Sequence, residues 1–207
     1  MCFTTPVLRG QTIDSALSYY PLAIGNSWQY MYADLWMNPP GVEYYTSVEI
    51  ISDTLMQNGH RYFVQSTSRT NSIPHSAFLR VDSASGTVFS WTATGELAAE
   101  TLRAKTGDRF HGLNCFEGSA TVFGSQIRVK AFGVTGSSFT LGYGFGLIAT
   151  NDEGTGLPKG DRLLYARIDG REFGTRVSVQ RDKLTRLPFF LRQNFPNPFN
   201  PSTEIHF

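Results

Sequence analysis

The sequence predicts an all-β protein, an antiparallel meander of roughly ten to twelve strands that forms a β-sandwich or a partly open β-barrel. Three observations predict this class. Aromatic residues make up 14% of the chain and charged residues 17%, with 20 glycines, a composition typical of β-rich proteins. Apolar and polar residues alternate with a period of two along most segments. Turn signals such as Asn58-Gly59 and Asp169-Gly170 separate these segments at short intervals.

The predicted domain spans residues 19–178 and opens with the run YYPLAIGNSWQYMYAD. Pro21 and the Gly25-Asn26 pair predict a turn, and the WQYMY run after it places alternate aromatic residues on one face of a strand. Residues 1–18 lack the basic start and the long apolar run of a complete signal peptide. They are therefore expected to be the remnant of a leader or a disordered segment.

Hairpins follow one another through the middle of the chain. VEYYTSVEIIS precedes HRYFVQSTS, and the Asn-Gly pair between them favours a type I′ turn, in which both central residues have positive φ. SAFLRV and TVFSW flank a polar loop over residues 82–86, CFEGSATVF and QIRVKAFGV meet at Gly124-Ser125, and RLLYARI and REFGTRV turn at an Asp-Gly pair. GELAAETL, residues 95–102, is expected to form a short helical turn or an irregular strand, and its alanine pair favours helix.

A glycine-rich run, SFTLGYGFGLIAT, is expected to form one strand. Its aromatic and leucine side chains would then share one face, and Gly142, Gly144 and Gly146 would share the other. A bare glycine face lets a large side chain or a bound molecule come very close to the backbone. Two interpretations stay open: Trp28 or Trp91 covers the glycines, or the glycine face is a ligand groove.

The loop NDEGTGLPKGD brings oxygen-bearing side chains close together in the sequence. They are Asn151, Asp152, Glu153 and Asp161. Hard oxygen ligands at a turn suit Ca²⁺, although their spacing does not match an EF-hand loop. Acidic residues beside glycines are also common in solvated turns. A calcium site and a solvated turn therefore remain alternatives, and no other cofactor is expected.

No catalytic motif is present in the sequence. It has no G-x-S-x-G elbow, no H-E-x-x-H motif and no paired cysteine ligands, and its 4 histidines are isolated from one another. Carboxylates such as Glu43, Glu96 and Glu117 could form a glycosidase pair, but the sequence does not place two of them at a working distance. The pattern favours a non-enzymatic protein and leaves a hydrolase as an alternative.

Charge, hydropathy and cysteine content limit the classes of partner and the membrane association that the sequence predicts. The net charge is +1 with scattered Lys and Arg, so no nucleic-acid partner is expected. No run of about 18 apolar residues occurs, so no transmembrane segment is expected. Cys2 and Cys115 could pair in an exported protein; alternatively, Cys115 is a small buried apolar residue.

The final run, LPFFLRQNFPNPFNPSTEIHF, is residues 187–207. Its prolines fix φ and remove backbone donors, so it is neither a helix nor a central strand. It resembles the opening of the C-terminal sorting domain of the type IX secretion system, F-x-L-x-Q-N-Y-P-N-P-F-N-P-S-T-x-I-x-F. The matching residues are Phe189, Leu191, Gln193, Asn194, Pro196, Asn197, Pro198, Phe199, Asn200, Pro201, Ser202, Thr203, Ile205 and Phe207, with Phe195 in place of the usual tyrosine.

This resemblance implies a cellular location and not a catalytic or binding activity. In the family, the run introduces a small Ig-like β-sandwich, so residues 187–207 are expected to be its truncated stub and residues 179–186 a linker. The implied partner is the type IX secretion machinery, and the implied location is secreted or at the outer-membrane surface. The run Y-x-P-L-x-x-G-N-x-W-x-Y near the start of the domain also resembles the first strand of β-rich surface proteins that carry no transferable activity.

Three functions follow as expectations. The leading one is a non-enzymatic, secreted or cell-surface β module with a structural, adhesive or surface-interaction role. The first alternative is a module that binds a glycan or a small apolar ligand. The second is a secreted hydrolase, which would need two converging titratable groups in a cleft.

Overall fold

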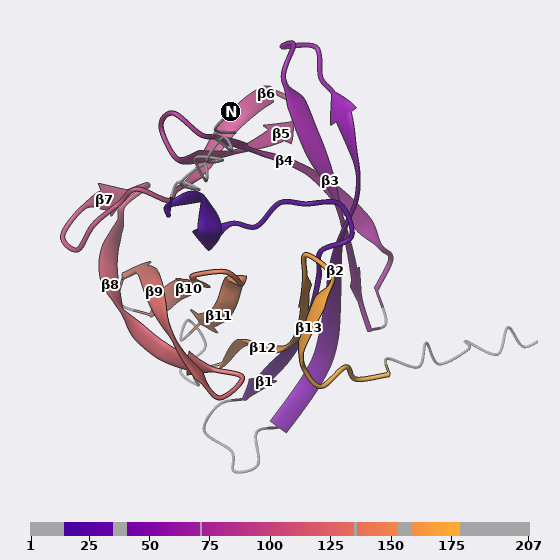
Figure 1. Ribbon diagram of the computed structural model, residues 1–207, viewed down its shortest axis with the longest axis vertical. Coiled ribbons are helices and arrows are strands. Elements are labelled where there is room, and N and C mark those ends of the chain that lie inside the picture. The colour runs from indigo at the N-terminus through magenta and orange to yellow at the C-terminus, as the bar shows by residue number, and fades with distance from the viewer. Residues whose placement is uncertain (1–14, 35–40, 71, 135, 153–158, 179–207) are drawn as a thin grey trace, which may run out of the picture.

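The computed structural model describes residues 15–34, 41–70, 72–134, 136–152 and 159–178, and it confirms the all-β class (Figure 1). The described elements are one 3-10 helix and thirteen strands, and all described strand pairs are antiparallel. They are η1 Leu17–Tyr19, β1 Ser27–Asp34, β2 Gly41–Leu55, β3 Arg61–Arg69, β4 His75–Asp82, β5 Thr87–Thr92, β6 Gly95–Thr101, β7 Arg109–Phe110, β8 Leu113–Val122, β9 Ser125–Val134, β10 Ser137–Gly142, β11 Gly146–Asp152, β12 Lys159–Ile168 and β13 Arg171–Gly174.

The strands form a single sheet that curves into a nearly closed barrel. Their order is β6-β5-β4-β3-β2-β1-β12-β11-β10-β9-β8-β7, and β13 pairs with β12 off this path. Figure 1 shows the sheet running round a ring, with η1 lying inside its outline. The sandwich alternative is therefore wrong, because one continuous sheet encloses the core instead of two facing sheets.

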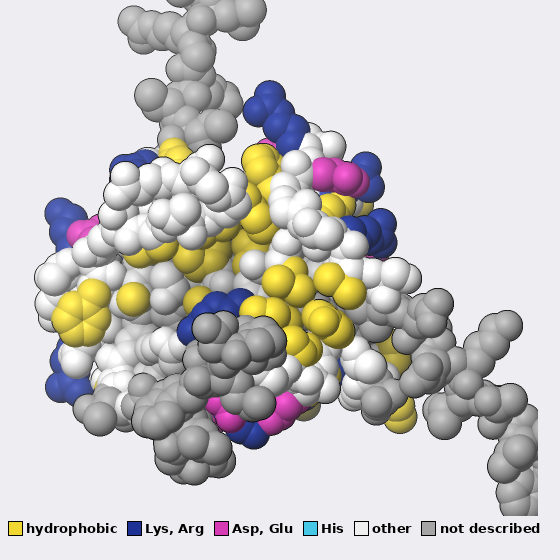
Figure 2. Space-filling view, turned by 90° about the horizontal axis from the view of Figure 1, so that it is seen from below, with side chains coloured by type: hydrophobic (Ala, Val, Ile, Leu, Met, Phe, Trp, Pro, Cys, Tyr) yellow, Lys and Arg dark blue, Asp and Glu magenta, His cyan; other side chains and the backbone are white. Residues whose placement is uncertain are grey.

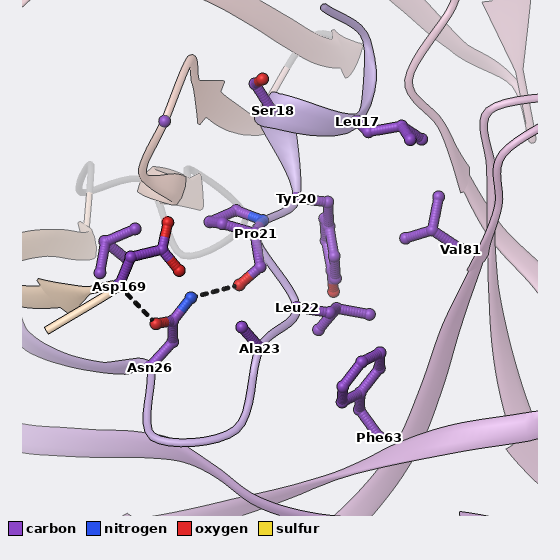
Figure 3. Close-up of a pocket in the computed structure, with 12 residues that line it drawn as sticks. Leu17, Ser18, Tyr20, Pro21, Leu22, Ala23, Asn26, Phe63, Val81 and Asp169 are labelled. Atoms are coloured by element: carbon purple, nitrogen blue, oxygen red, sulfur yellow. Dashed lines mark hydrogen bonds between the residues drawn. The ribbon is translucent and has the colours of Figure 1, made fainter. Parts of the chain in front are cut away.

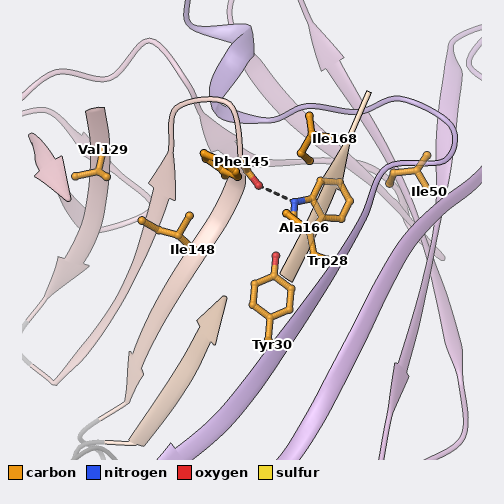
Figure 4. Packing of buried hydrophobic residues seen from close by; sticks show 8 residues of the cluster. All are labelled: Trp28, Tyr30, Ile50, Val129, Phe145, Ile148, Ala166 and Ile168. Atoms are coloured by element: carbon orange, nitrogen blue, oxygen red, sulfur yellow. Dashed lines mark hydrogen bonds between the residues drawn. The ribbon is translucent and has the colours of Figure 1, made fainter. Parts of the chain in front are cut away.

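Two apolar clusters fill the barrel. The first, called the joint cluster, lies beside the β1–β12 pair and comprises Trp28, Tyr30, Ile50, Val129, Phe145, Ile148, Ala166 and Ile168 (Figure 4). The second, called the seam cluster, lies between β6 and β7 and comprises Tyr19, Val88, Leu102, Ala104, Cys115, Phe132 and Leu141. Seen from below, apolar side chains gather toward the centre of the molecule, and most charged ones lie toward its periphery (Figure 2).

Most predicted hairpins form, and the backbone explains where their turns differ. Phe123-Gly124 and Asp169-Gly170 have positive φ at both residues, as a type I′ turn requires. At the predicted Asn58-Gly59 turn only Gly59 has positive φ, so type I′ is wrong there. The side chain of Asn58 instead accepts a hydrogen bond from the backbone N–H of His60 at 3.1 Å, in a wider loop.

The helical preference predicted for residues 95–102 is wrong. Gly95–Thr101 is strand β6, which pairs with β5 from Thr92↔Gly95 to Thr87↔Thr101. The backbone hydrogen bonds of this ladder outweigh the small helix propensity of two alanines, which is worth only tenths of a kcal/mol per residue.

Residues 137–152 form a hairpin instead of the predicted single strand. β10 ends at Gly142 and β11 begins at Gly146, and these two glycines face each other across the ladder. Positive φ at Gly144 and Gly146 turns the chain between them. The alternation inferred for a continuous strand therefore does not hold, and the three glycines do not share one face.

Several predicted features lie outside the described residues. These are Cys2, Glu153, the linker over 179–186 and the whole sorting motif over 187–207. At the other end, Leu17 and Ser18 belong to the fold, because η1 begins at Leu17, so the predicted domain boundary at residue 19 falls within the helix. No described helix is long and apolar enough to cross a membrane. Cys115 is fully buried and free, as expected of a small apolar residue.

Candidate functional site

The site is built on residues 17–26, called the mouth segment, which comprises η1 and the turn that leads into β1 across one end of the barrel. Three backbone hydrogen bonds fix it to the barrel. Gly144 N–H donates to the Ser18 carbonyl at 2.8 Å, Gly25 N–H donates to the Ile50 carbonyl at 2.8 Å, and Ile50 N–H donates to the Asn26 carbonyl at 2.9 Å. The mouth segment is therefore held in place by backbone hydrogen bonds to the barrel and forms one wall of the site.

The buried side chain of Asn26 completes this wall. Its Nδ2 donates to the Pro21 carbonyl at 2.9 Å, and its Oδ1 accepts a hydrogen bond from Asp169 N–H at 2.8 Å (Figure 3). Pro21 cannot donate a hydrogen bond itself, so its carbonyl is the group the turn offers to Asn26. One amide thereby ties the mouth segment to the β12–β13 turn, and its polar atoms are used up within the protein.

A cavity of about 360 Å³ opens between the mouth segment and the interior faces of β3 and β4 (Figure 3). Its described lining consists of Leu17, Ser18, Tyr20, Pro21, Leu22, Ala23, Asn26, Phe63, Val81, Gly144, Ile168 and Asp169. Most of these side chains are apolar, and Asp169 is the single acidic or basic residue among them. We call this cavity the mouth pocket.

A second cavity, of about 470 Å³, adjoins the mouth pocket on the side of β13. It shares Gly144, Ile168 and Asp169 with the mouth pocket, so these residues form the ridge between the two. Its remaining described lining includes Phe173, whose ring meets that of Phe145 edge-on at 5.0 Å. The two cavities thus share a ridge that includes Asp169, and Arg171 also lines the second cavity.

An unusual carboxyl group lies on the interior side of β6. Glu100 pairs across the ladder with Val88, which is fully buried. Its Oε2 is a buried atom with no hydrogen-bond partner among the described residues. Burial raises the pKa of this carboxyl from 4.5 to about 7. Burial also raises the pKa of the Tyr20 phenol, and the nearby charge of Glu100 raises it further.

The structure separates the residues of the predicted ligand face. Trp28 lies beside Gly146, and its Nε1 donates to the Phe145 carbonyl at 2.7 Å. Trp91 lies elsewhere, with its ring edge-on to Tyr62 at 5.7 Å. The space above Gly142 is filled by Ile127 and Ile148, since an added Cβ would lie 2.8 and 2.7 Å from them. Of the five, only Gly144 lines the mouth pocket.

The predicted calcium ligands are engaged by protein groups. Asn151 Oδ1 accepts a hydrogen bond from Arg162 Nη2 at 2.7 Å, and Asp161 Oδ2 accepts one from Thr150 Oγ1 at 3.0 Å. A guanidinium beside Asn151 repels a cation electrostatically. Asp152 belongs to β11, and Glu153 lies outside the described residues. Across the described part of the chain, no three His, Cys, Asp or Glu side chains form a group suited to a metal ion.

Aromatic rings on the described surface include the half-buried pair Tyr32 and Tyr44, which stack with their centroids 4.7 Å apart. The large apolar side chains exposed there are aliphatic except for Phe116. Tyr62 is fully buried although the Arg80–Glu96 ion pair lies beside it, and its hydroxyl donates to Glu96. The mainly apolar lining of the mouth pocket favours the apolar ligand over the glycan in the predicted binding alternative.

Sequence reasoning missed the residues that build the mouth pocket. Phe63 and Val81 come from different hairpins, and the mouth segment reaches them only through the barrel closure. Glu100 was missed because the alanine pair of its segment favoured a helical turn over an irregular strand. A period-two reading of GELAAET would have placed its last glutamate on one face of a strand, but not inside the barrel.

The sequence matches no protein-family model and no curated protein. Among solved structures, the fold is similar to that of a protein from Parabacteroides distasonis provisionally described as a lipoprotein. The TM-score is 0.47 and the sequence identity 9%, over 70% of this chain and 96% of that one. We transfer nothing from that protein to this one.

Proposed function

We propose that this protein is a non-enzymatic binding module whose mouth pocket holds a small, mainly apolar molecule. The observation that carries this proposal is a preformed cavity of about 360 Å³ with mostly apolar walls. Ligand pockets in proteins are typically of this size and lined mostly by apolar side chains, with a few polar groups that orient the ligand. Here Ser18 and Asp169 supply polar groups among the lining residues.

The charge distribution supports binding over hydrolysis. A hydrolase needs at least two converging titratable groups at the reacting atoms. Asp169 is the only acidic or basic residue that the described lining contributes, and the three described histidines, His60, His75 and His111, are not part of that lining. The pocket is therefore better suited to hold a molecule than to cleave one.

A thermal-shift measurement tests the binding proposal. We expect 1-octanol to raise the melting temperature of the full chain, because a ligand at about a hundred times its Kd stabilises the native state by about 2.7 kcal/mol. Val81→Phe should fill the pocket and abolish the shift, whereas Val134→Phe, at a position 46% exposed at the end of β9, should leave it unchanged. A cooperative transition that no apolar ligand moves would refute the proposal.

We further propose that the module reaches the cell exterior through the type IX secretion system, where it is secreted or held at the outer-membrane surface. The support is the motif over residues 187–207, with its proline, asparagine and phenylalanine residues at fixed offsets. A structural or adhesive role at the surface is compatible with this route. Fusing the complete gene product to a reporter should place the reporter outside the cell. Retention in the periplasm of cells with an active secretion system would contradict this route.

A further inference from the structure

Glu100 Oε2 needs a hydrogen-bond donor that the described protein does not supply. It is buried and has no partner among the described residues, whereas buried polar atoms in native proteins are almost always paired. A carboxylate oxygen accepts hydrogen bonds and cannot donate them. Such an atom inside a barrel therefore calls for a donor other than the described residues, and a water molecule or a ligand can supply one.

The ladder register connects Glu100, which is not itself a lining residue, to one wall of the mouth pocket. Val81 lines the pocket and pairs with Val88 of β5, and Val88 pairs with Glu100 of β6. Directly opposed residues point to the same face of a sheet, with Cβ atoms about 5 Å apart. Val81, Val88 and Glu100 thus form one row on the interior face, which leads from the pocket wall to the carboxyl group.

Tyr20 links this carboxyl to the pocket from the other side. Its ring lines the pocket, and its phenol is close enough to Glu100 for the two to interact electrostatically. The face of a tyrosine ring attracts cations. Asp169 adds a negative charge at the rim, and no Lys or Arg occurs among the described lining residues. The charged and aromatic groups that line the mouth pocket favour a positively charged ligand, whereas Arg171 lines the adjoining cavity.

We propose that the ligand of the mouth pocket is an apolar amine, whose ammonium group donates to the Glu100 carboxylate while its hydrocarbon part fills the pocket. This inference rests on the proposed binding function and adds the chemical class of the ligand. An ammonium group supplies the missing donor and also compensates the carboxylate charge in a low-dielectric interior, which an alcohol cannot do.

Matched probes with the same chain length test the inference on the full protein. Kd values for n-octylamine and 1-octanol are measured by calorimetry at about pH 8.5 and about pH 5.5, and the amine stays protonated at both, like a lysine side chain. Among the described residues, the titratable group that interacts with Glu100 is the phenol of Tyr20, which stays neutral over this range because burial raises its pKa. We expect octylamine to bind on the order of tenfold more tightly than octanol at the higher pH, and this preference to shrink at the lower pH.

Glu100→Gln keeps the shape of the side chain and removes its charge. The preference for octylamine should disappear in Glu100→Gln and persist in Glu49→Gln, which removes an exposed carboxylate from β2. Near pH 7, octylamine binding to the wild type should also release protons, because the ammonium stabilises the ionised carboxyl. Proton release is measured in buffers of different ionisation enthalpy, and it needs no variant.

The outcomes separate the two proposals. Equal binding of octylamine and octanol at both pH values, or an amine preference that survives in Glu100→Gln, would overturn the inference. The binding function would stand in that case, because octanol still occupies the pocket. If neither probe binds, the binding function fails and the inference fails with it.

Discussion

At the β1–β12 joint the barrel is closed by backbone, whereas at the β6–β7 seam it is closed by side chains and an irregular segment. The joint has a ladder from Ser27↔Arg167 to Asp34↔Lys159, interrupted by one bulge. The two strands that form it are among the most distant in the sequence. At the seam, strands that are consecutive in the sequence stand at opposite edges of the sheet.

Residues 102–108, called the seam segment, occupy the gap at the seam. Leu102 and Ala104 are buried, and Leu102 N–H donates to the Gly86 carbonyl at 2.8 Å. The buried Lys130 of β9 donates from its Nζ to the Ala104 carbonyl and forms an ion pair with Glu117 at 3.1 Å. At the seam, a lysine side chain therefore donates the hydrogen bond to a backbone carbonyl that a neighbouring strand donates at the joint.

The two junctions should be destabilised by different kinds of substitution. A continuous ladder requires close backbone approach, so the joint depends on small residues such as Ala33 and Gly160, which pair with each other. The seam depends on particular side chains that satisfy buried polar atoms. Substitutions that add volume should therefore damage the joint, and substitutions that change charge should damage the seam.

The largest effect is expected at Gly160. An added Cβ would lie 1.9 Å from the Thr150 carbonyl oxygen, which is backbone and cannot move aside cheaply. Gly160→Ala should cost at least about 4 kcal/mol in the free energy of unfolding, measured by urea denaturation. Gly118→Ala is the control, because its Cβ would lie 3.9 Å from Val129 Cγ2, an ordinary contact. Thr150 belongs to β11, so equal stability of the two variants would mean that close approach of β11 does not limit the volume at this position of the joint strand β12.

Glu100, on the seam strand β6, should make stability depend on pH. Its folded pKa of about 7 lies above the ordinary 4.5, so its contribution is fully present below about pH 4.5 and is lost as the pH rises through 7. Relative to Glu100→Gln, the wild type should lose about 2–3 kcal/mol between pH 5 and pH 8.5. Urea denaturation of both proteins at the two pH values measures this. Parallel pH profiles would contradict burial of the carboxyl.

Lys130→Met should weaken the seam while preserving the volume of the side chain. The Ala104 carbonyl then loses its donor, at a cost of about 1–2 kcal/mol. Glu117 is partly exposed and can be solvated by water. Hydrogen exchange should accelerate in the seam segment and remain slow across β1 and β12. Uniform acceleration over the whole barrel would show that the seam does not open independently.

The smallest effect is expected for the matching lysine at the joint. Lys159 pairs with Glu43 on the surface, and both side chains are accessible to solvent. Lys159→Met should leave the urea midpoint unchanged within error, because the backbone ladder already closes the joint. A loss comparable with that of Lys130→Met would remove the distinction between the two junctions.

The sequence by itself determined the features that depend on neighbouring residues. Period-two alternation and turn residues predicted the all-β class and most hairpins, including the Asp169-Gly170 turn, because both signals arise within a few residues. Burial of Cys115 followed from its residue type. The local signals misled where two interpretations were close in energy, as in the alanine pair of β6 and the glycines between β10 and β11.

Tertiary structure alone decided how the barrel closes and where its pocket lies. Pairing of Ser27 with Arg167 depends on the twist and curvature accumulated over the whole sheet, which no local pattern records. That pairing brings Phe63, Val81 and the mouth segment around one cavity, and the closed barrel buries Glu100 Oε2. Hydrophobic periodicity predicts which side of a strand is buried. Which strands face each other across the interior is determined only when the sheet closes.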